Sequence, residues 1–122
     1  MTELRDRIKE IIDSEDVVLF MKGTPQMAMC GNSMRALAAL RAVDAPFAAV
    51  DILPDPAIRQ ELSALSGWPT IPQVFVKGEL IGGADIVQEL EANGELAQKL
   101  HSALGEDYAA ARDERTLALA VS

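Results

Sequence analysis

The chain has 122 residues, of which 49% are hydrophobic and 25% charged, and its formal net charge is −8. This length fits one compact domain, and because the apolar runs are short, the sequence predicts neither a membrane-spanning helix nor a secretory signal. The acidic balance argues against nucleic acid as a partner, because affinity for phosphates requires clustered lysine and arginine.

The first part of the chain predicts a covering helix followed by a strand–helix–strand unit. Apolar residues recur at helical spacing from about Thr2 to Ser14, with charged residues between them. The continuous apolar run Val17–Met21 is typical of a strand that is buried on both faces. An alanine-rich helix over 34–42 and a strand over 46–52 follow. Two strands joined through a helix imply a parallel pair with a right-handed crossover.

The second part predicts three more helices and a hairpin. Asp55 followed by Pro56 indicates a helix start, because the carboxylate caps the helix and proline suits its first position. Residues 73–81 predict two strands around a turn at Gly78. Asp85 with Gln88 fits an N-cap and capping box. A last helix is expected over 95–104, so the fold class is α/β, a mixed four-stranded sheet flanked by helices.

The C-terminal stretch is harder to assign. It is alanine-rich, charged in its middle and apolar near its end. We assign the domain to residues 1–105 and residues 106–122 to a tail, which is either a docked helix or a frayed end.

Cys30 is the only cysteine, and it lies where a loop meets the second predicted helix. The unpaired N–H groups of the helix start favour a thiolate, and Lys22 adds positive charge. Ser33 stands where a C-x-x-C motif has its second cysteine, so the chain cannot form this disulfide by itself. With no predicted secretory signal, and with one cysteine that leaves no internal disulfide framework, a reducing, cytoplasmic setting is expected. The alternative is a buried thiol that serves only as a small hydrophobe.

Three loops are expected to surround this thiol at one end of the sheet. A proline that leads into a strand, as in Ile71–Pro72, is often cis and leaves the preceding backbone free to pair with an extended peptide. Gly82–Gly83, followed by a helix start, offers N–H groups to a carboxylate. Lys22 and Arg59 could hold a second carboxylate, although a lone arginine is more often a solvated surface charge. A peptide with two carboxylates, an amine and a thiol fits this set, and glutathione is such a peptide.

Seven segments carry a family resemblance and occur in this order: Lys22-Gly23-Thr24-Pro25, Cys30-Gly31-Asn32-Ser33, Asp51-Ile52-Leu53, Ile58-Arg59, Trp68 to Gln73, Lys77 to Gly83, and Asp85-Ile86-Val87. Over about Leu4 to Leu100 the chain resembles a monothiol glutaredoxin of the CGFS type, with CGNS as its own motif. The resemblance implies a thioredoxin-like fold and assigns residues 1–105 to a glutaredoxin domain. Asn32 departs from the family's phenylalanine and Ala28 from its usual proline.

The resemblance also implies the ligands of the site. Six residues would contact glutathione: Lys22 and Arg59 at its glycyl carboxylate, Ile71 at its cysteinyl backbone, Gly83 and Ala84 at its γ-glutamyl carboxylate, and Asp85 at its amine. Cys30 would be the catalytic thiol and would ligate a [2Fe–2S] cluster. Such a cluster takes four thiolates and one chain supplies one, so two chains and two glutathiones are expected to share it. The cluster-bound form would be a homodimer, and the apo form a monomer.

Three functions follow from this site. The preferred one is a carrier that assembles the cluster with glutathione and passes it to apo iron–sulfur proteins. The alternative is a glutathione-dependent thiol oxidoreductase that reduces glutathionylated proteins, so that any enzymatic activity is at most weak thiol–disulfide exchange. The third is a glutathione-binding adaptor whose tail recruits partners. Asn32 weakens the preference for the carrier, because an amide in place of an apolar shield admits water and alters cluster stability.

Overall fold

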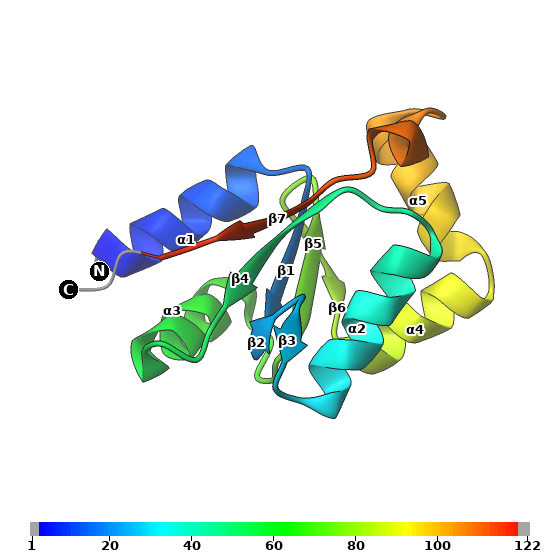
Figure 1. The fold of residues 1–122 in the computed structure, drawn as a ribbon. Coiled ribbons are helices and arrows are strands. Elements are labelled where there is room, and N and C mark those ends of the chain that lie inside the picture. Colours follow the sequence, from blue (N-terminus) through cyan, green and yellow to red (C-terminus); the bar gives the residue numbers. More distant parts are fainter. Residues whose placement is uncertain (1–2, 120–122) are drawn as a thin grey trace.

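The structure, a computed structural model, describes residues 3–119, which form a main sheet with helices on both faces and a separate two-stranded hairpin (Figure 1). The helices are α1 (Glu3–Ser14), α2 (Gly31–Ala42), α3 (Pro56–Ser66), α4 (Ala84–Ala92) and α5 (Glu95–Leu104), with a 3₁₀ turn η1 (Tyr108–Ala111). The strands are β1 (Val17–Met21), β2 (Gly23–Thr24), β3 (Met27–Ala28), β4 (Phe47–Asp51), β5 (Gln73–Val76), β6 (Glu79–Gly82) and β7 (Glu114–Leu117). None of the described helices has the length and apolarity that crossing a bilayer requires.

The main sheet has the strand order β6-β5-β1-β4-β7 and is mixed. Strand β1 runs parallel to β4 on one side and antiparallel to β5 on the other. Strands β5 and β6 form the predicted hairpin, with Val76 paired to Glu79. The predicted thioredoxin-like α/β fold is confirmed.

Both faces of β1 are covered, which explains its continuous apolar sequence. Side chains alternate between the faces of a strand. Val17, Leu19 and Met21 therefore join the core that lies against α2, α4 and α5. Val18 and Phe20 join the core that lies against α1 and α3. Figure 1 shows these two helical layers on opposite sides of the sheet.

The C-terminal stretch corrects two predictions. Strand β7 pairs in parallel with β4, so the sheet has five strands and not four, and Glu114–Leu117 is neither a helix nor a frayed end. Side chains also hold this stretch on the domain. Arg41 forms two hydrogen bonds of 2.8 Å with Glu114, and the buried Tyr108 hydroxyl donates to the carbonyl of Val43 at 2.8 Å. Thr2 of the predicted first helix and residues 120–122 of the predicted tail lie outside the described residues.

Two helix starts were predicted from capping patterns, with different outcomes. Asp55 is the N-cap of α3, and its carboxylate accepts from the N–H of Ala57 at 2.8 Å, as expected. The N-cap of α4 is Gly83, whose extended backbone ends the hairpin, so the assignment of Asp85 as N-cap is wrong. Asp85 lies within the first turn of α4, which leaves its carboxylate free to bind a group outside that helix.

Candidate functional site

Cys30 is the N-cap residue of α2, with extended backbone angles of φ −152° and ψ 136°. It is a half-buried free thiol. The preceding loop forms a short hairpin of β2 and β3, which is tied back to the ends of the parallel strands. The N–H of Met29 donates to the carbonyl of Lys22 at 2.9 Å, and the N–H of Gly23 donates to Asp51 Oδ1 at 2.9 Å. The hairpin therefore places the thiol at the carboxyl end of β1 and β4, where α/β sheets bind ligands.

Ser33 has a larger part in the site than its place in the motif suggested. It is fully buried, and its Oγ accepts from the backbone N–H of Lys22 at 3.0 Å, which joins the end of β1 to α2. Its own backbone N–H, donated to the Cys30 sulfur, holds the pKa of the thiol below its ordinary value. The N–H of Asn32 and the charge of Lys22 lower this pKa further, while burial opposes them.

These contacts predict the pH dependence of Cys30 alkylation in the absence of glutathione. The thiolate reacts and the thiol does not, so a lowered pKa keeps Cys30 reactive at a pH where an ordinary cysteine is protonated. Lys22→Gln removes one stabilising charge. The pKa is then expected to rise, so that the midpoint of the iodoacetamide rate profile moves to higher pH and alkylation at neutral pH slows.

The control for this profile is Lys99→Gln, which makes the same charge change on an exposed position of α5. Its midpoint should equal that of the unchanged protein. A Lys22→Gln midpoint that stays in place, or that moves to lower pH, would contradict the electrostatic account.

The predicted glutathione residues line two hollows that share one turn. The first hollow, of about 730 Å³, contains Lys22 and Arg59 together with Pro69. Arg59 is exposed on α3, and its Nη2 donates to the carbonyl of Pro69 at 3.2 Å. The structure thus brings Lys22 and Arg59 to one place, and their binding of a carboxylate remains a prediction.

The second hollow, of about 420 Å³, is lined by the other predicted residues: Ile71, Gly83, Ala84 and Asp85, with Pro72 and Asn32 beside them. The Ile71–Pro72 bond is cis. Residues next to Cys30 connect it to both hollows. Lys22, which lines the first hollow, forms backbone hydrogen bonds with Met29 and with Ser33 Oγ, on either side of Cys30 in the chain. Asn32 lines the second hollow.

Gln73 fixes the turn between the hollows, and sequence reasoning did not identify it. Its side chain is fully buried, and its amide donates to the carbonyls of Trp68 at 3.0 Å and Thr70 at 3.1 Å. A Cβ atom on Gly83 would lie 3.1 Å from Trp68 Nε1 and 3.3 Å from the carbonyl of Pro72. Glycine at this position therefore lets the indole and the turn pack against the start of α4.

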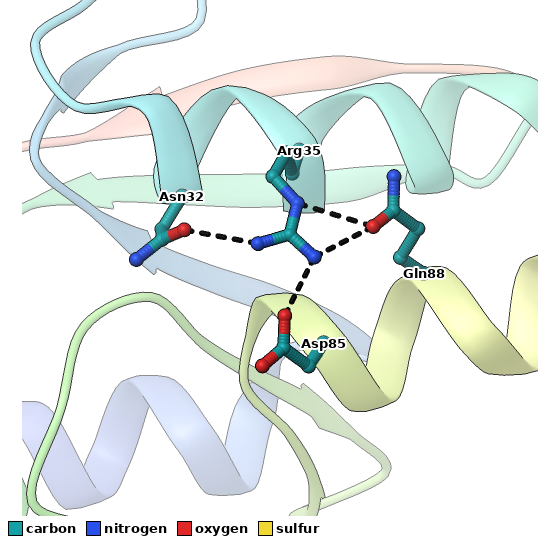
Figure 2. A network of polar contacts seen from close by, with 4 residues as sticks. All are labelled: Asn32, Arg35, Asp85 and Gln88. Carbon is teal, nitrogen blue, oxygen red and sulfur yellow. Dashed lines mark hydrogen bonds and ion pairs between the residues drawn. The ribbon is translucent and has the colours of Figure 1, made fainter.

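Arg35 is the second group that the sequence did not reveal. Figure 2 shows its guanidinium between α2 and α4, where Nη2 forms an ion pair with Asp85 Oδ1 at 2.6 Å. Nη1 donates to Asn32 Oδ1 at 3.0 Å, and Nη2 and Nε donate to Gln88 Oε1 at 2.6 and 3.1 Å. The predicted capping box of Asp85 and Gln88 is therefore wrong, because both side chains bind Arg35. The sequence does contain two polar pairs at i, i+3 spacing, Asn32 with Arg35 on α2 and Asp85 with Gln88 on α4. Their contact with each other becomes evident only when α2 is known to pack on α4.

The sequence model of the glutaredoxin family matches residues 17–81. The chain is 53% identical over 87 residues to "Probable monothiol glutaredoxin GrlA" of Legionella pneumophila subsp. pneumophila, covering 71% of this chain and 98% of that protein. It is 52% identical over 97 residues to "Monothiol glutaredoxin-S11" of Oryza sativa subsp. japonica. That match covers 80% of this chain but only 20% of the rice protein, so the chain spans a small part of such longer relatives.

Solved structures agree with this assignment. The solution structure of reduced poplar apo GrxS14 has a TM-score of 0.72 and 40% identity, and the match covers 83% of this chain and 93% of that one. The crystal structure of a buckwheat glutaredoxin–glutathione complex has a TM-score of 0.72 and 25% identity, covering 84% and 96%. With its fold, its lone N-cap thiol and these relatives, the chain belongs to the glutaredoxin family and to its monothiol members.

Proposed function

We propose that this monothiol glutaredoxin binds glutathione and, as cargo, a [2Fe–2S] cluster, which it passes to apo iron–sulfur proteins. The observation that carries the proposal is a half-buried thiol at a helix start, beside two hollows that contain every predicted glutathione residue. Within residues 3–119, no group of three or more His, Cys, Asp and Glu side chains could hold a metal ion alone. Cys30 would therefore need thiolates from glutathione and from a second chain to complete a cluster.

The charges of the two hollows support glutathione as the ligand. Lys22 and Arg59 bring two cations to the first hollow, which suits the glycyl carboxylate. The second hollow contains the first N–H groups of α4 and the carboxylate of Asp85, which suit the α-carboxylate and the amine of the γ-glutamyl group. The buckwheat relative, whose structure was solved with glutathione, adds support from the family.

The surface around Cys30 supports a shared site between two chains. Met27, Met29 and Met34 flank the thiol in sequence and are 69%, 62% and 57% exposed. Where such exposed apolar side chains form one patch, they mark a surface that a partner covers. We therefore propose a cluster-bridged homodimer and a monomeric apo form. We also propose a cytoplasmic location, because glutathione and the thiol stay reduced there.

Reduction of glutathionylated proteins is the second candidate, and the lowered pKa of Cys30 favours it. The Cys30 thiolate would attack the glutathione sulfur of the mixed disulfide, which forms a Cys30–glutathione disulfide and releases the protein thiolate. The thiolate of a second glutathione would then attack that disulfide. Oxidised glutathione leaves, and the Cys30 thiolate is restored.

Anaerobic reconstitution with iron, sulfide and glutathione tests the carrier. We expect [2Fe–2S] absorption and a dimer by size-exclusion chromatography, and neither when glutathione is omitted. The holo dimer should then transfer its cluster to an apo ferredoxin. A colourless monomer would reject the carrier function, and reduction of a glutathionylated peptide by the same sample would then establish the oxidoreductase.

A further inference from the structure

We propose that Arg35 binds the α-carboxylate of the γ-glutamyl group, and that it makes this end of the site selective for thiol peptides that carry both an α-carboxylate and an α-amine. The inference rests on the proposed glutathione site and assigns a residue that the family resemblance does not supply. Its basis is the network of Arg35, Asn32, Asp85 and Gln88 in Figure 2.

The position of Arg35 satisfies the first requirement, which is access to the ligand. Arg35 lines the same hollow of about 420 Å³ as Gly83, Ala84 and Asp85, and its side chain is 38% exposed. Among the described residues that line this hollow it is the only cation, since Lys22 and Arg59 line the other one. A carboxylate placed at the start of α4 therefore has Arg35 as its nearest candidate for a charged partner.

The partners of Arg35 satisfy the second requirement, which is a charge that is held in place but little neutralised. Asn32 and Gln88 contribute neutral amide oxygens from α2 and α4, so they orient the guanidinium without cancelling its charge. Asp85 is the charged partner in the network, and only its Oδ1 takes part. Because the Asp85 side chain is 89% exposed, water screens this ion pair, and the pair opens readily.

The two ends of the ion pair match the two charges of an α-amino acid. In the free protein Arg35 and Asp85 bind each other. When the γ-glutamyl group enters, its ammonium takes the Asp85 carboxylate and its carboxylate takes the Arg35 guanidinium, so one exposed pair is exchanged for two. A ligand with the amine but no carboxylate would place an uncompensated cation beside Arg35. A ligand with the carboxylate but no amine would still form an ion pair with the guanidinium of Arg35.

Calorimetric titration of the full chain with three thioethers tests this assignment, because a thioether cannot exchange with Cys30. The ligands are S-methylglutathione, its analogue with glutaryl in place of γ-glutamyl, which lacks the amine, and its analogue with γ-aminobutyryl, which lacks the α-carboxylate. Arg35→Gln should weaken binding of the first two by about fivefold each, and it should leave binding of the third unchanged or tighter, because the like charge beside its ammonium is gone. Arg35→Lys should keep part of the preference for the first two.

Arg41→Gln is the matched control, since it removes the same charge from α2 where Arg41 binds Glu114 and not the hollow. Equal weakening of all three ligands by Arg35→Gln would reveal a structural role and overturn the proposal. Unchanged or tighter binding of S-methylglutathione would overturn it too, because Arg35 would then contact only Asp85. An unchanged protein that bound none of the ligands would instead overturn the glutathione site itself.

A measurement on the unchanged protein covers the case in which Arg35→Gln fails to fold. The Arg35 Nε–H resonance should shift on addition of S-methylglutathione and of the glutaryl analogue, and it should shift less with the γ-aminobutyryl analogue, which brings no carboxylate to the guanidinium. A resonance that responds to all three alike, or to none while S-methylglutathione binds, would overturn the assignment.

Discussion

Cys30→Ser is expected to abolish cluster binding and to slow reduction of a glutathionylated peptide by at least about a thousandfold. A serine hydroxyl stays protonated at neutral pH and is a poor ligand for soft metals, and the chain has no other cysteine to replace it. The measurements are the absorption of the reconstituted protein and the initial rate of peptide reduction with excess glutathione.

The fold of this variant should be intact, because a serine hydroxyl can accept from the same N–H groups at the start of α2 and the side chain is only half-buried. Its thermal unfolding midpoint is the check. Ser102→Ala provides a control, since Ser102 is exposed on α5 and lines neither hollow, so its replacement should leave both activities in place. A Cys30→Ser protein that still assembled the cluster or reduced the peptide would place the chemistry elsewhere.

Gly23→Ala should lower the free energy of unfolding by about 3 kcal/mol, the largest stability effect that we expect at the site. Gly23 has φ +91°, a conformation that side chains rarely adopt. A Cβ atom there would lie 2.3 Å from the carbonyl oxygen of Met27 and 2.9 Å from the N–H nitrogen of Met29. Because both are backbone atoms of the same hairpin, the clash is relieved only by opening β2 from β3. Urea unfolding measures the loss.

Gly31→Ala is the matched control, because a Cβ atom there meets nothing within 4 Å and α2 has already begun. Its effect on stability should be within about 0.5 kcal/mol. Opening the hairpin should also displace Lys22 and Cys30, so that Gly23→Ala loses glutathione-dependent activity at temperatures where it is still folded. Equal unfolding midpoints for the two variants would show that the hairpin accommodates the methyl group.

Local signals in the sequence predicted most of the domain. The apolar run Val17–Met21 required a strand covered on both faces, and Asp55 with Pro56 required a helix start, because each pattern depends only on neighbouring residues. Strand β7 has no such signal. Glu114–Leu117 is largely polar, and it becomes a strand because β4 has a free edge to which its backbone can bond.

The functional site likewise has features that the sequence predicted and features that depend on tertiary packing. The sequence by itself determined the lone thiol at a helix start, the absence of a second cysteine at Ser33, and the glycines beside α4, since these depend on residue type and spacing along one element. Only the tertiary structure decided that Ser33 joins Lys22 to α2 and that Arg35 reaches Asp85. These contacts cross between elements, so they depend on how helices pack on a sheet, and side chains 50 residues apart in the chain meet only when that packing has formed.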